Sequence, residues 1–183
     1  LNEWNYVKGW IDDEWIYSLK NEKGLKGSAF IASVMCMSQY EAVDNLMFYD
    51  ARPSGMNSMF STDLIFQCLK GYYPFYMFNQ LYKQAEAVQI TRESEDVWAC
   101  AAAGEEQNVM LAYFNDELNA PEKTVKVEFK NVNNTNGIKL EYYCLDQSHD
   151  CELVREEIFT SNDFAAYIKM QKCTTYLLKI IQL

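Results

Sequence analysis

The residues best suited to chemistry stand at the start of the chain, in residues 1–7 (LNEWNYV). The Glu3 carboxylate lies there among amide, indole and phenol side chains. Cleavage of a glycosidic bond passes through an oxocarbenium-like transition state, which needs an ionised carboxylate on one face of the sugar and a protonated carboxyl on the other. Glu3 could supply one of these groups. The alternative is a solvated terminal position, because most Glu residues are surface residues.

The composition is that of a globular protein. A chain of 183 residues with 49% hydrophobic residues is long enough for one large domain or two small ones with a core. Aromatic residues make up 15%, and Tyr and Trp combine a flat apolar face with a polar group, which suits either a carbohydrate site or core packing. A net charge of −10 argues against nucleic acid as a partner, because phosphates attract a cationic surface.

No segment predicts a membrane span. The longest apolar window, residues 29–37, is interrupted by Ser33 and is too short to cross a bilayer, so it predicts a buried helix. The chain begins at Leu1 without Met or a signal peptide, and we expect the polypeptide to start upstream. Its location, cytoplasmic or secreted, stays open.

The cysteines predict no metal site, and nothing else in the sequence supports a metal or another cofactor. The six cysteines lack the Cys-x-x-Cys spacing of zinc and redox motifs. Cys36, Cys68 and Cys100 are expected to be buried free thiols. Cys144 and Cys151 flank a polar turn and could face each other across a hairpin, either as free thiols or as a disulfide.

The single histidine lies in that same polar turn. His149 has Asp146 and Asp150 as close neighbours in the sequence. A lone histidine among turn carboxylates is expected to be solvated, so we assign it no catalytic role.

The elements that must position Glu3 follow it directly. Residues 8–23 carry Gly9, a run of three acidic residues at 12–14 and two Trp, which predicts a long loop. Trp10 or Trp15 could line a substrate cleft or could only pack at its rim. Residues 24–39 have helical spacing and predict a buried helix.

A second strand is predicted at residues 43–49, where an apolar run ends before a loop with Pro and Gly. A strand, a helix and a strand with this crossover form a βαβ unit, whose strands are parallel. The strand ends at Glu3 and at Tyr49-Asp50 are therefore expected on one face of the sheet, where barrel and open-sheet enzymes place their sites.

Residues 61–84 predict two further helices. Ser61, Thr62 or Asp63 could cap the first, Gly71 interrupts the helical run, and Pro74 suits the first turn of the second.

From residue 84 the periodicity changes to short alternating runs between polar turns. Residues 124–130 (TVKVEFK) alternate apolar and polar side chains, as a strand with one buried face does. Strands are predicted at 86–93, 97–103, 108–114, 123–130, 138–144, 151–158, 164–170 and 173–181. Successive strands without helices between them predict an antiparallel β-sandwich.

With these elements in place, the chain resembles the C-terminal part of a clan A retaining glycoside hydrolase, above all family thirty-nine, the β-xylosidase and α-L-iduronidase group. The resemblance rests on residues 1–7, the helix at 24–39, FYDARP at 48–53 and LKGYYPFYMF at 69–78, and it covers essentially the whole chain. It implies an α/β plus all-β fold: strands seven and eight of a TIM-type (β/α)8 barrel with their helices in residues 1–85, and an antiparallel β-sandwich in residues 86–183.

The resemblance also implies roles for individual residues. Glu3 would be the strand-seven nucleophile, and the substrate-binding residues would be Trp4, Asn5, Trp10, Tyr49 and Asp50. Asn2-Glu3 also matches the pair at the acid/base on strand four, but only one further strand separates Glu3 from the sandwich, which favours strand seven. Tyr49 departs from the Trp that the family commonly carries, so the sugar subsite is not assigned.

The resemblance limits what this chain can do alone. Retaining hydrolysis needs a second carboxyl about 5–5.5 Å from the nucleophile, and the clan supplies it from strand four, which this sequence lacks. We therefore expect a fragment of a longer enzyme or a truncated product, inactive alone, with a carbohydrate as its partner. Open strand edges and exposed apolar faces predict self-association, or rearrangement of the first ~20 residues away from barrel geometry. The alternative is a non-catalytic carbohydrate-binding or structural β-sandwich module.

Overall fold

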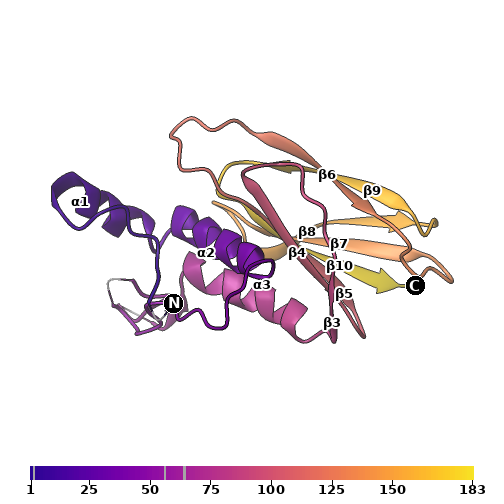
Figure 1. Ribbon diagram of the computed structural model, residues 1–183, viewed down its shortest axis with the longest axis horizontal. Coiled ribbons are helices and arrows are strands. Elements are labelled where there is room, and N and C mark those ends of the chain that lie inside the picture. The colour runs from indigo at the N-terminus through magenta and orange to yellow at the C-terminus, as the bar shows by residue number, and fades with distance from the viewer. Residues whose placement is uncertain (2, 56, 64) are drawn as a thin grey trace.

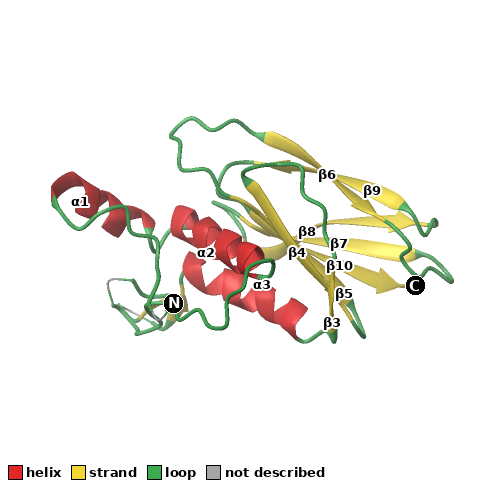
Figure 2. Cartoon of the chain, viewed as in Figure 1, coloured by secondary structure: helices red, strands yellow, loops and turns green. Residues whose placement is uncertain are grey.

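The computed structural model describes residues 1, 3–55, 57–63 and 65–183. The second half of the chain forms two antiparallel sheets that pack face to face (Figures 1 and 2). The larger sheet has the strand order β3-β4-β5-β10-β7-β8, and the smaller sheet pairs β6 with β9. The strands are β3 (Glu86–Val88), β4 (Val97–Ala103), β5 (Gln107–Tyr113), β6 (Lys123–Phe129), β7 (Ile138–Leu145), β8 (Asp150–Phe159), β9 (Phe164–Met170) and β10 (Thr175–Gln182).

The alternating sequence pattern explains how these strands bury one face. In β9, Ala166, Ile168 and Met170 are buried, whereas Tyr167 and Lys169 are exposed. In β7 and β10, which are buried on both faces, every second side chain fills the space between the two sheets. The main side chains of this core are Val109, Leu111, Tyr113, Ile138, Leu140, Tyr142, Ala166, Ile168, Met170, Leu178 and Ile180. The antiparallel sandwich predicted from the sequence is therefore consistent with the structure.

Helices cover the opposite face of the larger sheet. The helices are α1 (Asp12–Asn21), α2 (Leu25–Ser38) and α3 (Tyr73–Tyr82), with a 3-10 turn η1 (Lys70–Tyr72) before α3. Figure 1 shows α2 and α3 against the sheet and α1 projecting away from it. The core of this layer contains Ala32, Cys36, Met77 and Leu81 packed on Cys100, Met110, Ala112 and Leu177.

The helix α2 and the helix α3 with Pro74 in its first turn match the sequence-based expectation. Because these helices share a core with the sheet, the molecule has three layers. The domain boundary between residues 85 and 86 stays a prediction. Among the described residues, no helix has the length and apolar character needed to cross a bilayer.

The predicted loop at residues 8–23 is wrong, because α1 occupies most of it. The three acidic residues Asp12, Asp13 and Glu14 lie in the first turn of α1, and Lys20 lies in its last turn. Negative charge near the N-terminus and positive charge near the C-terminus stabilise a helix through its unpaired backbone groups and its dipole. The three consecutive acidic residues therefore indicate the N-terminus of a helix and not a loop.

The first of the two helices predicted in residues 61–84 is also wrong. A short hairpin of β1 (Phe60–Ser61) and β2 (Gln67–Cys68) takes its place. The rings of Phe60 and Phe66 stack across the hairpin with centroids 5.2 Å apart, and Phe60 also contacts Tyr72. Aromatic packing across the strands thus outweighs the capping pattern.

All six cysteines are free thiols. Cys36 and Cys100 are buried as predicted, and their Sγ atoms lie 3.4 Å apart between α2 and β4. Cys68 is only half-buried. The disulfide considered for Cys144 and Cys151 does not form: Cys144 lies opposite Glu152, and Cys151 sits with a φ of 63° where the register of β7 and β8 shifts.

Candidate functional site

The first residues run parallel to residues 45–49. Met47 N donates to Leu1 O (3.1 Å), Trp4 N donates to Met47 O (3.2 Å), and Tyr49 N donates to Trp4 O (3.0 Å). The parallel direction confirms the expected relation of the two segments. The predicted strands are less regular than expected, because the described residues of these two segments form a single isolated bridge, between Trp4 and Phe48.

Alternation along the first segment separates its side chains onto two faces. Trp4 and Tyr6 both pack against Phe30 of α2, with ring centroids 6.2 and 5.4 Å away. Successive side chains of an extended segment point in opposite directions. Glu3 and Asn5 therefore point away from the helix layer, and Glu3 is exposed. The other member of the predicted pair, Asn2, lies outside the described residues.

The end of the second segment meets this outward face. Asn5 Nδ2 donates to the backbone oxygen of Tyr49, 2.5 Å away. The Tyr49-Asp50 peptide bond is cis, and the Tyr49 side chain is 41% exposed. Asp50 accepts a hydrogen bond from Arg52 N (3.1 Å) and forms an ion pair with the Arg52 guanidinium (3.4 Å). The structure thus joins Asn5 directly to Tyr49, while Asp50 is braced by its own loop.

The two Trp residues of the predicted site lie elsewhere. Trp4 packs edge to face on Phe48 on the helix side of the segment, and its indole N–H is buried without an acceptor among the described residues. Trp10 is 64% exposed and stacks on Trp15, with centroids 5.0 Å apart. The structure therefore does not bring Trp4 onto the outward face of Glu3, and Trp10 belongs to an aromatic pair at the start of α1.

A polar cluster behind the outward face was not predicted from the sequence. Lys26 of α2 forms an ion pair with Asp116 (2.5 Å) and donates to the Tyr17 hydroxyl, while Tyr6 donates to Asp116 Oδ1 (2.7 Å). Burial and the Asp116 carboxylate raise the pKa of Tyr6, and the hydrogen bond from Lys26 lowers the pKa of Tyr17. Residues so far apart in the chain give no sequence pattern that would reveal such a cluster.

A buried carboxyl at the end of α1 was also missed. Glu22 is only 3% exposed, and this burial raises the pKa of its carboxyl to about 7. With its amide nitrogen turned toward Glu22, Asn57 donates to both carboxyl oxygens (3.2 and 2.5 Å). A lone Glu in a charged run carries no signal of burial, so sequence reasoning had no means of finding it.

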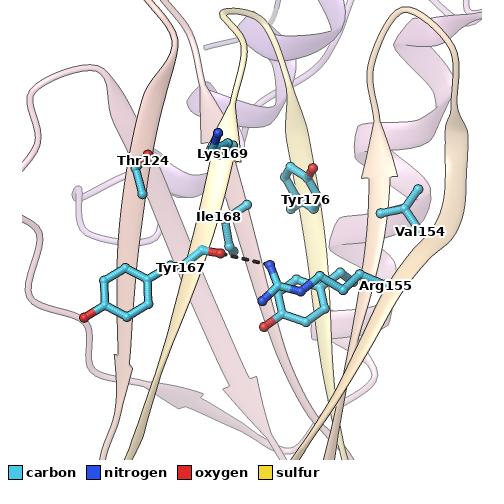
Figure 3. Close-up of a pocket in the computed structure, with 8 residues that line it drawn as sticks. Thr124, Val154, Arg155, Tyr167, Ile168, Lys169 and Tyr176 are labelled. Atoms are coloured by element: carbon cyan, nitrogen blue, oxygen red, sulfur yellow. Dashed lines mark hydrogen bonds between the residues drawn. The ribbon is translucent and has the colours of Figure 1, made fainter.

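The sandwich carries a separate cavity of about 360 Å³ at its edge. Figure 3 shows Arg155 reaching from β8 to the backbone of Tyr167 on β9. Arg155 donates to Tyr167 O (3.0 Å), lies over the Tyr142 ring (4.6 Å) and pairs with Glu157. The lining residues are Thr124, Tyr142, Val154, Arg155, Tyr167, Ile168, Lys169 and Tyr176.

One group of possible metal ligands occurs among the described residues. Cys144, Asp146 and His149 gather in the turn between β7 and β8, apart in the chain from Glu3 and from Tyr49.

Comparisons with known proteins support the fold. No family model matches the chain, and no curated protein matches it. Solved structures do match. A glucosidase from Croceicoccus marinus matches with a TM-score of 0.75 and 13% identity, over 100% of this chain and 45% of that chain. A GH39 enzyme from Xanthomonas axonopodis pv. citri matches with a TM-score of 0.72 and 8% identity, over 100% of this chain and 44% of that chain. A bacterial orthologue of human α-L-iduronidase also matches, with a TM-score of 0.73 and 8% identity, over 88% of this chain and 39% of that chain.

The chain spans less than half of the length of these enzymes. The matching regions are the C-terminal parts of glycoside hydrolases with a TIM barrel, as the resemblance implied. At such low identity, the likeness shows the fold alone. The chain therefore has the fold of the C-terminal part of a clan A glycoside hydrolase.

Proposed function

We propose that the chain is the C-terminal fragment of a retaining glycoside hydrolase with Glu3 as the strand-seven nucleophile. The observation that supports this is the division of the first segment into two faces. Trp4 and Tyr6 contact α2, so Glu3 and Asn5 point to the opposite side. In a barrel, helices cover the outside, and catalytic residues come from the carboxyl ends of the strands.

Each side chain on that face has a role in this proposal. Glu3 attacks the anomeric carbon as the glycosidic C–O bond breaks and the leaving oxygen takes a proton from the acid/base carboxyl. Water then hydrolyses the covalent glycosyl-enzyme intermediate. Asn5, held by the backbone of Tyr49, lies two residues further along the same face and fixes the second segment beside the nucleophile. Arg52 holds Asp50 at the rim. The acid/base carboxyl would come from a part of the protein beyond these 183 residues.

The test is covalent labelling of the longer protein. A 2-fluoro-glycoside inactivator is expected to add one sugar to the peptide that contains Glu3, and Glu3→Gln is expected to abolish labelling. Glu41→Gln, which changes another exposed carboxylate, serves as the control and should label normally. Labelling of a different carboxylate, with Glu3→Gln still labelled, would reject Glu3 as the nucleophile.

The isolated chain provides the complementary measurement. We expect no turnover of aryl xylosides and related aryl glycosides, because a nucleophile without its acid/base partner lacks half of the retaining mechanism. Turnover that Glu3→Gln abolishes would show that the chain contains a complete site.

The cavity in the sandwich favours a second candidate function, non-catalytic carbohydrate binding. Its volume of about 360 Å³ lies in the usual range for small-molecule sites. Tyrosine rings offer apolar faces for a sugar ring, while Arg155 and the exposed Lys169 offer donors for its oxygens.

Replacing one exposed wall of the cavity tests this candidate. Tyr167 is 55% exposed, so Tyr167→Ala should leave the fold intact while weakening the binding of xylan or other oligosaccharides in calorimetry. Tyr82 is 79% exposed on α3, and Tyr82→Ala is the matched control. Equal oligosaccharide binding by both variants would exclude the cavity as the carbohydrate-binding site.

The proposal also accounts for an apolar groove beside the first segment. The groove has a volume of about 660 Å³, and its walls include Leu1, Trp4, Phe30, Val34, Met37 and Val43. We propose that the rest of the barrel covers it in the longer enzyme. In the isolated chain, the groove is expected to drive self-association, which light scattering would detect as a mass above 21.3 kDa. Val43→Lys should reduce association, and Leu118→Lys on the sandwich should not.

A further inference from the structure

The turn between β7 and β8 is fixed by its own backbone. Asp146 N donates to His149 O (3.1 Å), which closes the turn. Asp146 Oδ1 accepts hydrogen bonds from Ser148 N (2.8 Å) and His149 N (2.9 Å). These bonds fix the position of the Asp146 carboxylate relative to the backbone of the turn.

Two further donor atoms converge on this carboxylate. Cys144 Sγ lies 3.4 Å from Asp146 Oδ2, and His149 Nδ1 lies 2.9 Å from Asp146 Oδ1. One ligand atom from each residue can be chosen so that all three lie within 4.8 Å of one another. In a zinc site with ligand distances of about 2.0–2.3 Å, neighbouring tetrahedral ligands lie about 3.3–3.5 Å apart. The three side chains thus stand close to the spacing that one ion requires.

We propose that this turn is a zinc site, with Cys144 Sγ, an Asp146 carboxylate oxygen and His149 Nδ1 as its ligands. A thiolate with an imidazole and a carboxylate selects Zn²⁺ over Mg²⁺ or Ca²⁺, which prefer oxygen ligands alone. Three protein ligands leave the fourth position of the tetrahedron to water. The site is independent of the glycosidase proposal, and it departs from the expectation of no metal that the cysteine spacing gave.

The surroundings of the turn are compatible with a cation. Cys144 is 1% exposed at the end of β7, whereas the His149 side chain is 38% exposed, so an ion can enter from the histidine side. Binding releases the thiol proton to solvent, and His149 binds through Nδ1 after the proton that this atom shares with Asp146 leaves it, so that the bound imidazole carries a proton on Nε2 alone.

A lysine beside the turn bonds its backbone and not the three ligand atoms. Lys70 of η1 donates to Asp146 O (2.7 Å) and His149 O (3.1 Å), so it bonds the backbone of the turn rather than the ligand atoms. Its charge is offset by an ion pair with Asp150 at 2.6 Å. Lys70 therefore ties the turn to the helix layer while the three ligand side chains stay available.

Cobalt is the spectroscopic probe, because Co²⁺ takes tetrahedral zinc sites and gives a thiolate charge-transfer band. We expect this band to saturate at one Co²⁺ per chain and to disappear when Zn²⁺ is added. Cys144→Ser should abolish the band, and His149→Gln should weaken zinc binding at least tenfold. Asp146→Asn keeps an oxygen that can accept the turn hydrogen bonds and should also weaken binding. Cys151→Ser, which removes the nearest cysteine in the chain, is the matched control and should leave the band unchanged.

Two results would overturn the site. One is a natively folded protein, judged by circular dichroism, that gives no charge-transfer band at stoichiometric Co²⁺. The other is a band that persists in Cys144→Ser, because it would come from a different thiol. If Cys144→Ser does not fold, His149→Gln decides instead, because His149 lies half-exposed in the turn and its loss removes a ligand without opening the core. Zinc binding by folded His149→Gln equal to that of the wild-type chain then rejects the site.

Discussion

The sandwich and the N-terminal layer differ in how completely each buries its apolar side chains. The sandwich closes its core between its own two sheets, with Ile138, Leu140 and Leu178 fully buried. The N-terminal layer buries α2 and α3 against the sheet, but its loops and first helix leave large apolar residues in solvent. Among the described residues of 1–85, the large apolar side chains more than 60% exposed are Leu1, Trp10, Ile11, Ile65, Phe66 and Tyr82, whereas in residues 86–183 they are Leu118 and Ile158.

The two regions therefore differ in where the partners of their apolar side chains lie. Apolar residues in the sandwich already have partners within the same 98-residue stretch, residues 86–183. In the N-terminal layer, the inner sides of α2 and α3 pack on the sheet, while the described residues of the segment that carries Glu3 form one isolated bridge, between Trp4 and Phe48. The proposed glycosidase explains the contrast, because the rest of a barrel would cover the segment with Glu3.

The largest expected effects come from the two cores. Leu178→Ala in the sandwich and Met77→Ala in the helix layer remove fully buried side chains, and each should cost about 2–5 kcal/mol of unfolding free energy. Because the helices share a core with the sheet, both variants should shift one cooperative transition. Denaturation would be followed by tryptophan fluorescence, which reports mainly on the N-terminal layer, and by circular dichroism.

Leu118→Ala, at a site that is 83% exposed, is the control and should change stability little. Two separate transitions, with Met77→Ala moving only the fluorescence signal, would mean that the helix layer is an independent unit.

The same contrast explains what the sequence could predict. In the sandwich, strands are predicted at residues 97–103 and 164–170, and β4 and β9 occupy those residues. Each of these strands has a buried face, so local alternation and final structure agree. In the N-terminal layer, the acidic residues of α1 and the hairpin near Phe60 were misread, because charge at a helix end and stacking of Phe60 on Phe66 decide these two elements.

The candidate site also has a part that the sequence predicted and a part that it could not predict. The parallel relation of the first segment to residues 45–49 followed from βαβ geometry, and the structure confirms it. Whether Trp4 faces a helix or a substrate depends on which side of the segment α2 covers, and the sequence does not carry that information. Phe30, Glu22 and the Lys26 cluster meet their partners only after folding, so no spacing rule could reveal them.

A smaller effect should come from Glu22 and depend on pH. The pKa of this carboxyl is about 7 in the folded chain and about 4.5 when unfolded. Below the lower value both states hold the proton. Between the two values, the unfolded chain releases a proton that the folded chain keeps, so the free energy of unfolding falls as pH rises. The loss of unfolding free energy is complete above about pH 8 and amounts to at most about 3 kcal/mol. The hydrogen bonds that the Asn57 amide donates to the ionised carboxylate make this loss smaller.

Glu22→Gln removes this titration. The stability of the variant relative to the wild-type chain should therefore rise between about pH 5 and pH 8, measured by urea denaturation at each pH. Glu14→Gln, on the exposed part of α1, is the control and should show no such trend. A constant difference between Glu22→Gln and the wild-type chain would show that Glu22 does not carry the pH dependence.

The smallest expected effect tests the junction between the first segment and the sandwich. Tyr6→Phe removes the hydroxyl that donates to Asp116 but keeps the ring on Phe30, so it should cost about 0.5–1.5 kcal/mol. Lys26 still pairs with Asp116, which prevents a larger loss from an unpaired carboxylate. Tyr82→Phe, at a site that is 79% exposed, is the matched control.

Hydrogen exchange shows where that loss falls. If the Tyr6 hydroxyl ties the first segment to the sandwich, Tyr6→Phe should speed exchange at Trp4 and Tyr49, whose amides form the bonds between the two segments. Amides in the sandwich core should exchange as before, because their partners lie within the two sheets. Equal acceleration in both regions would mean that the segment carrying Glu3 opens only with the whole molecule, and that the two regions differ in burial but not in local stability.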